Sequence, residues 1–245
     1  MRKRHYSVDY LIPSRRVKYP FLTAEAIESA AEGLRRSASG GDGLAPCLDL
    51  DALIYDYLCE TEELVFDDEQ FLPLEDGEEV LGKIFPLRGK ILIHAPLKRE
   101  RPFGRFRFTV AHELGHWVLH RPLFLAEAQQ IPLFDPRLDV QMTSLNRSVF
   151  PSGNQIGPEE WQANQFASCL LIPPALLRDE FRRRFGAPPA AFRDSGVTRL
   201  PSLRFFARDL ATKRIRRKPS LHELFGVSAE AMTVTLLQRG LVIDQ

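Results

Sequence analysis

Long apolar runs are absent from this sequence of 245 residues. A membrane-spanning helix needs about 18 or more consecutive apolar residues, and the candidates here are short segments such as CLLIPPALL at 169–177. The basic N-terminus, residues 1–16, also lacks the continuous apolar stretch of a secretory signal. We therefore expect a protein without membrane contact and with a cytoplasmic location.

Cysteine is scarce as well, with three widely separated residues that form no CxxC pair: Cys47, Cys59 and Cys169. An odd, scattered set argues against a disulfide framework and favours the reduced thiols of an intracellular protein. Cys169 lies within FASCLLIP and is predicted to be a small core residue rather than a nucleophile. Apolar content of 44% and charged content of 27% exclude wholesale disorder.

The formal net charge is only +1, because two segments of opposite charge largely cancel. No Lys or Arg lies between Ser37 and Gly82, where there are 14 acids. Between Arg178 and Lys218 there are 13 bases against 4 acids. Two solvated faces that attract each other in the fold would explain both segments. The alternative is a basic patch that binds nucleic acid or an acidic partner.

The spacing of apolar residues predicts a mainly helical chain with a small sheet. Helices are expected over 23–36, 49–58, 106–121, 158–172, 175–185, 202–215, 220–226 and 228–240. Strands are expected over 63–68, 78–87 and 89–96, with a hairpin between the last two. Pro122 should end its helix. The stretch 122–158 is rich in Pro, Gly, Asn and Ser, so it is either a functional loop or partly disordered.

These elements predict an α+β fold, with a mainly helical domain, a small β-sheet beside the helix at 106–121, and a C-terminal helical segment. We expect a basic N-terminal arm over 1–20, a main domain over 21–186 and a C-terminal helical region over 187–245. There are no internal repeats that would indicate a solenoid or an array.

The segment HELGH at 112–116 carries the clearest chemical signal in the chain. His112 and His116 are four residues apart, so on a helix they share one face and can bind one metal ion. Glu113 can reach a water on that ion and accept its proton, so that the water attacks a carbonyl. Apolar residues on the opposite face favour this metal site over a helix with solvated histidines.

A catalytic zinc needs a third protein ligand, and His120 is the nearest candidate. On a straight helix it lies about 12 Å from His112 along the axis, too far for both to bind one ion. We therefore expect His120 either to contact a metal ligand without binding the metal, or to be structural. In the later helix, Glu160 and Asn164 are four residues apart and share one face. Glu160 would complete a His/His/Glu set, with Glu159 as its competitor, and Asn164 could orient a metal-binding imidazole.

The segments RFRFTVAHELGHWVLH at 105–120 and EEWQANQFASCLLIP at 159–173 resemble the ImmA/IrrE family of zinc metallopeptidases. The match is close at His112, Glu113, His116, Glu160, Ala163, Asn164, Phe166, Ala167, Leu170, Leu171 and Pro173. The resemblance implies a peptidase whose zinc is bound by the two histidines and Glu160, with Glu113 as general base. Manganese, cobalt or iron would also suit such a ligand set. Gln162 departs from the family, which commonly has an acid there.

Members of this family commonly cleave or inactivate helix-turn-helix repressors or antitoxins. The resemblance therefore implies a regulatory protein as substrate and a role in transcription regulation. An extended substrate would pair with an edge of the sheet, which the segment ILIHAP at 91–96 could supply. His94 in this segment is expected to be a strand residue, and we assign it no role.

Two other functions compete with hydrolysis. A regulatory docking protein would keep the metal and inactivate its partner without cleavage, although such a protein has no need of Glu113. A DNA-associated regulator would use the basic run KRIRRK at 213–218, although no DNA-reading motif accompanies that run.

Overall fold

The structure, a computed structural model, describes residues 19–39, 45–75, 77–99, 104–128, 142–145, 157–192 and 202–244. It confirms the predicted α+β class, because helices dominate and are accompanied by one four-stranded and one two-stranded sheet. Most of the expected basic arm, residues 1–18, lies outside the described residues. Within the described ranges, no helix combines the length and the apolar character that crossing a bilayer requires.

The larger sheet has the strand order β1-β3-β2-β4. Its strands are β1 (Val65–Asp67), β2 (Val80–Phe85), β3 (Lys90–Ile93) and β4 (Met142–Leu145). The predicted hairpin is confirmed, since β2 is antiparallel to β3 and the short 3-10 turn η2 (Pro86–Arg88) joins them. Gly89 ends this turn with a φ of 63°, a left-handed conformation that favours glycine. β1 pairs parallel with β3, and β4 pairs antiparallel with β2.

The prediction of a substrate-binding edge at residues 91–96 is wrong. β3 lies between β1 and β2 and so has a neighbour on each side. It ends at Ile93, and the short helix α2 (Ala95–Arg99) follows, because Pro96 suits the first turn of a helix. His94 lies just past the strand, and its Nδ1 accepts a hydrogen bond of 2.9 Å from the backbone N of Leu72. This bond ties the loop before β2 to the end of β3.

The first two helices begin at the predicted caps. Oγ1 of Thr23 accepts a hydrogen bond of 3.2 Å from the backbone at the start of α1 (Ala24–Ala38). Oδ1 of Asp49 accepts one of 3.0 Å from the backbone N of Ala52. The helix that Asp49 caps continues as the π-helical stretch η1 (Ala52–Cys59). Local capping chemistry therefore sets both starts.

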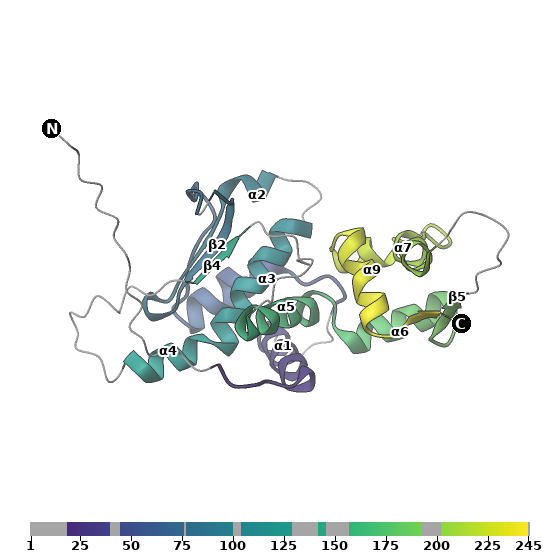
Figure 1. The fold of residues 1–245 in the computed structure, drawn as a ribbon, viewed down its shortest axis with the longest axis horizontal. Helices are drawn as coiled ribbons and strands as arrows, with labels where there is room; N and C mark the ends of the chain where they lie inside the picture. The colour runs from purple at the N-terminus through teal and green to yellow at the C-terminus, as the bar shows by residue number, and fades with distance from the viewer. Residues whose placement is uncertain are drawn as a thin grey trace.

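The predicted helices around the two motifs are α3 (Gly104–Leu119) and α5 (Pro158–Leu171), which lie side by side at the centre of the molecule (Figure 1). The helix that carries HELGH ends at Leu119, before Pro122, as predicted. A further helix that was not predicted, α4 (Arg121–Ala128), follows it, and Pro122 occupies its first turn, where a missing N–H forfeits no intrahelical bond. Residues 129–141 and 146–156 lie outside the described residues.

The C-terminal helices are α6 (Pro174–Phe185), α7 (Leu203–Thr212), α8 (Leu221–Phe225) and α9 (Ala229–Gln238). A parallel pair of strands, β5 (Ala190–Phe192) and β6 (Val242–Asp244), was not predicted, because three residues are too few to show an alternating pattern. In Figure 1, α6, α7 and α9 lie at the end of the molecule away from the larger sheet. Buried residues on both sides of Gly186 belong to one hydrophobic cluster, and the boundary at that residue stays a prediction.

Cys169 is buried, as predicted, and its Sγ accepts a hydrogen bond of 2.9 Å from Nη2 of Arg239. All three cysteines are free thiols. In the described ranges, the charged residues of each segment form ion pairs with residues that are nearby in the sequence. Acids of 49–79 pair with Lys83, Lys90, Lys98 and Arg105, and bases of 178–218 pair with Asp179, Glu180, Glu223 and Glu230. These ion pairs do not support an attraction between the two segments.

Candidate metal centre

Two close contacts hold α3 between the larger sheet and α5. On one side, a Cβ at Gly82 of β2 would lie 2.5 Å from Oε1 of Glu113. On the other side, a Cβ at Gly115 would lie 3.0 Å from Cα of Ala163 and 3.1 Å from its carbonyl oxygen. Because glycine has no Cβ, it permits both approaches. The backbones of α3 and α5 therefore come close enough for side chains of both helices to meet.

The three predicted ligands meet between these helices. Nε2 of His112 lies 3.0 Å from Nε2 of His116. The two carboxylate oxygens of Glu160 each lie 3.3 Å from one of these nitrogens. In the described part of the chain, these residues form one group whose ligand atoms all lie within 4.8 Å of one another.

The distances within this group suit a divalent metal ion. Tetrahedral zinc with bonds of about 2.0–2.1 Å holds its ligand atoms about 3.3 Å apart. The observed separations of 3.0 and 3.3 Å are close to that value. Two imidazoles and one carboxylate also match the His/His/Glu set of hydrolytic zinc sites, which leaves one coordination position open.

The local electrostatics favour a neutral His116 and an anionic Glu160, whereas His112 must lose a proton before it can bind a metal. Burial lowers the pKa of His116 to about 4, so its imidazole is neutral near pH 7. Burial opposes the charge of His112, but its hydrogen bond with Glu160 and the charge of Glu113 raise the pKa of His112 above its ordinary value. Burial also opposes the charge of Glu160, yet hydrogen bonds with both histidines hold its pKa well below the usual range. The carboxylate is thus anionic near pH 7.

A chain of hydrogen bonds behind the ligands orients His116. Nδ1 of His116 lies 2.8 Å from Nδ1 of His120, and Nε2 of His120 lies 2.9 Å from Oε1 of Gln162. Nε2 of Gln162 donates to the carbonyl oxygen of Pro20 at 2.8 Å. If His116 keeps its Nε2 lone pair for a metal, it donates from Nδ1 to His120, which donates from Nε2 to Gln162. His120 thus lies behind the ligands, in agreement with the sequence expectation for it.

Asn164 orients the other imidazole, because its Oδ1 lies 3.0 Å from Nδ1 of His112 and can accept the proton that leaves Nε2 free. We expect Asn164→Ala to weaken zinc binding by about 10–100-fold, as removal of such an orienting partner typically does. Competition with a chromophoric chelator measures this change. Gln165→Ala, the next position on α5, is the matched control and should leave the affinity unchanged. Equal affinities of the two variants would remove this role from Asn164.

The two remaining acids of the motifs point in different directions. Glu113 is fully buried and packs against Gly82. Its charge acts on His112, so it lies close to the metal-binding group without belonging to it. The side chain of Glu159 folds back over the start of α5, where a Cβ at Gly157 would lie 2.5 Å from its Oε1. The structure therefore brings Glu160, and not Glu159, to the two histidines.

Gly115→Ala is expected to destabilise the protein by about 1–3 kcal/mol, because the added methyl group overpacks the contact between α3 and α5. Gly33→Ala is the matched control: Gly33 lies in α1 with nothing within 4 Å of its added Cβ. That change should stabilise the helix by roughly 0.5–1 kcal/mol. Urea unfolding of both variants in metal-free buffer measures the difference. A stabilised Gly115→Ala protein would show that the helices are not held by this contact.

Sequence reasoning missed the packing roles of Gly82 and Gly115 and the hydrogen bonds of Gln162. A glycine inside a helix costs about 1 kcal/mol relative to alanine, so Gly115 within HELGH was a usable signal of close packing. The role of Gln162 had no such signal. Its partner Pro20 is 142 residues away in the chain, and only the fold brings them together.

Neither a scan against protein-family models nor a search of curated proteins found a match to this chain. The site consists of a His/His/Glu group contributed by two helices of an α+β protein, with a second acid, Glu113, against the neighbouring sheet.

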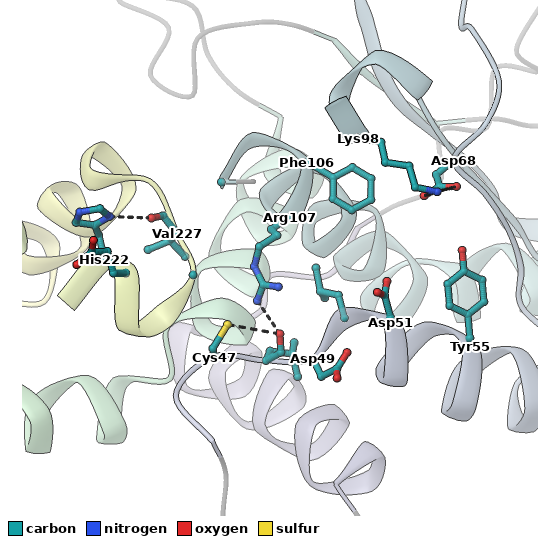
Figure 2. A pocket seen from close by; sticks show the side chains of 15 residues that line it. Cys47, Asp49, Asp51, Tyr55, Asp68, Lys98, Phe106, Arg107, His222 and Val227 are labelled. Carbon is teal, nitrogen blue, oxygen red and sulfur yellow. Dashed lines mark hydrogen bonds and ion pairs between the residues drawn. The ribbon is translucent and has the colours of Figure 1, made fainter. Parts of the chain in front are cut away.

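A pocket of about 980 Å³ lies apart from the metal centre, where α8 approaches η1 and the start of α3 (Figure 2). Two of its charged side chains bind groups of the protein itself. Lys98 lies 2.9 Å from Asp68, and Nη2 of Arg107 donates to the carbonyl oxygen of Leu48 at 2.7 Å. The described residues that line it include none of His112, His116 and Glu160.

The basic run at 213–218 forms an exposed turn between α7 and α8. Arg216 and Arg217 adopt left-handed φ values of 49° and 65°, and a β-bridge joins Ile215 to Lys218. Arg214 pairs with Glu223. The run is accessible, but a contact with nucleic acid stays a prediction.

Proposed function

We propose that this chain is a zinc-dependent endopeptidase that hydrolyses a peptide bond in a regulatory protein, with Glu113 as the general base. The observation that carries the proposal is the convergence of His112, His116 and Glu160 within 4.8 Å of one another. Helices with solvated histidines would have no reason to bury these imidazoles against a carboxylate from another helix. A metal ion would supply that reason, since it requires its ligand atoms to converge on one point.

His112, His116 and Glu160 would hold the ion. When bound, zinc lowers the pKa of water and polarises a carbonyl group. Glu113 accepts the proton of the attacking water and returns it to the amine that leaves. Asn164 and His120 keep both imidazoles oriented with Nε2 toward Glu160, as their hydrogen bonds require.

The substrate class follows from the resemblance to the ImmA/IrrE family, which rests on the two motif segments at 105–120 and 159–173. We infer that the substrate is a helix-turn-helix repressor or an antitoxin and that its cleavage relieves repression. Manganese, cobalt or iron would fill the same ligand set if zinc were scarce.

Chelation tests the proposal. Fluorescein-labelled β-casein and a panel of purified helix-turn-helix repressors serve as substrates. Hydrolysis should stop with 1,10-phenanthroline and return when zinc is added, because the ion is needed to activate water. Elemental analysis of the same samples follows the metal. A hydrolysis rate that is insensitive to the chelator would contradict a metallopeptidase.

One observation favours a second function, a docking protein that inactivates its partner without cleavage. Glu113 has no exposed surface, so a substrate cannot touch it in this conformation. A docking protein would inactivate its partner equally well with and without the Glu113 carboxylate. A peptidase would lose its effect with Glu113→Gln.

A further inference from the structure

We propose that strand β4 is an internal mimic of the substrate: it occupies the edge of β2 to which an extended substrate would add, and it must leave before a substrate can bind. This inference rests on the proposed peptidase function, whose substrate class and regulation it specifies. The substrate would be an extended segment, antiparallel to β2, recognised mainly through its backbone.

The first step of the argument is the pairing of β2. β3 covers one edge of β2 and β4 covers the other. β4 runs antiparallel to β2, with Ser144 opposite Gly82, Thr143 opposite Lys83 and Met142 opposite Ile84. A four-residue strand therefore satisfies backbone groups of β2 that would otherwise be available to another chain.

The second step is the position of this pairing. Gly82 is the residue of β2 that contacts Glu113, the proposed general base. Neighbouring strands are about 4.8 Å apart, so the backbone at Ser144 passes one strand spacing from Gly82. The segment on this edge therefore runs beside the group that would act on a scissile bond.

The third step is the full burial of Glu113. A general base must come within hydrogen-bond reach of the water that attacks the substrate. Some part of the protein must therefore move before Glu113 can act. α3 and α5 are packed backbone against backbone at Gly115, whereas β4 is a short strand at the edge of the sheet. The short edge strand is the element that opens at the lower cost.

The sequence of β4 indicates which kind of segment can bind at this edge of β2. Met142, Thr143, Ser144 and Leu145 carry no charge and include no proline. Proline in a strand removes a ladder hydrogen bond, so a substrate segment with proline at these positions would bind poorly. We infer that the cleaved partner presents an uncharged, proline-free extended segment.

A proline variant tests whether β4 competes with such a segment. Of two consecutive strand residues, one directs its N–H toward the neighbouring strand, so Thr143→Pro with Ser144→Pro removes at least one bond to β2. The matched control, Thr143→Val with Ser144→Thr, changes the same side chains and keeps both N–H groups. The probe is a fluorescein-labelled peptide with the sequence of residues 140–147. Its binding is measured by anisotropy in the Glu113→Gln background, so that turnover does not intervene.

The peptide should bind the proline variant at least about tenfold more tightly than the control, because a tethered competitor has been removed. Equal affinities would overturn the proposal. The same substitutions with Glu113 intact should raise the cleavage rate of labelled β-casein. If the peptide binds more tightly but no variant cleaves anything, the β4 proposal stands and the peptidase proposal fails. If wild type cleaves casein but the proline variant neither cleaves faster nor binds the peptide more tightly, the peptidase proposal stands and the β4 proposal fails.

A disulfide provides a second test that does not depend on how the proline variant folds. Lys83→Cys with Thr143→Cys places two cysteines directly opposite each other in β2 and β4. Oxidation should abolish peptide binding and casein cleavage, and reduction of the same sample should restore both. Lys83→Cys alone controls for loss of the lysine and for oxidation of the native thiols. Equal binding of the peptide by the oxidised and reduced forms would show that β4 does not need to leave.

Discussion

Glu113→Gln is expected to lower the rate of peptide hydrolysis by about 10²–10⁴-fold, the usual contribution of a general base, while zinc binding is retained. The amide has the shape of the carboxylate, so its packing against Gly82 is preserved. It cannot accept a proton from water, and it also lacks the charge that raises the pKa of His112. Initial rates with labelled β-casein or a repressor measure the first effect, and elemental analysis measures the second.

Glu159→Gln is the matched control for this experiment. It makes the same chemical change on α5, but its side chain folds over Gly157, away from the metal-binding group. We expect its rate to stay within about twofold of wild type, as for most surface substitutions. A Glu113→Gln enzyme as fast as this control would remove Glu113 as the base. Relief of repression by Glu113→Gln without cleavage would establish docking instead.

Glu160→Ala should abolish stoichiometric zinc binding, because it removes the carboxylate that lies 3.3 Å from both imidazole nitrogens. Two histidines alone leave the ion without the third protein ligand that catalytic sites require. The loss should exceed the roughly 10–100-fold effect expected from an orienting residue such as Asn164. Elemental analysis after dialysis measures the metal content.

Glu159→Ala is the control for this second prediction and should retain the metal of wild type. Zinc retained by Glu160→Ala but lost from Glu159→Ala would mean that the wrong acid has been assigned. Absence of metal from wild type, even after incubation with zinc, would mean that HELGH only resembles an active site. The docking function would then take precedence.

The helix boundaries were predictable where local chemistry sets them. Thr23 and Asp49 cap their helices with their own side chains, and this interaction spans about one helical turn. Pro122 shows the limit of such reasoning. Proline disrupts the interior of a helix but suits its first turn. Which case applies to Pro122 depends on where the neighbouring helices end and begin, at Leu119 and Arg121.

The pairing of strands that are distant in the sequence could not be predicted either, because it depends on the tertiary structure. The strands β5 and β6 lie at 190–192 and 242–244, and each is too short to show an alternating pattern. The role of residues 91–96 as an edge also failed, because strand order depends on β1 and β4 arriving on either side of the hairpin. Neither neighbour is encoded in the strand itself.

The spacing of four residues is enough to place His112 and His116 on one helical face, because that geometry is a property of the helix and not of the fold. It also allows Glu113 to lie beside the first of them. The choice between Glu159 and Glu160 is different, because it depends on how α5 is rotated against α3. That rotation is set where Gly115 meets Ala163, a contact between helices that are distant in sequence, and packing of this kind exists only in the folded protein.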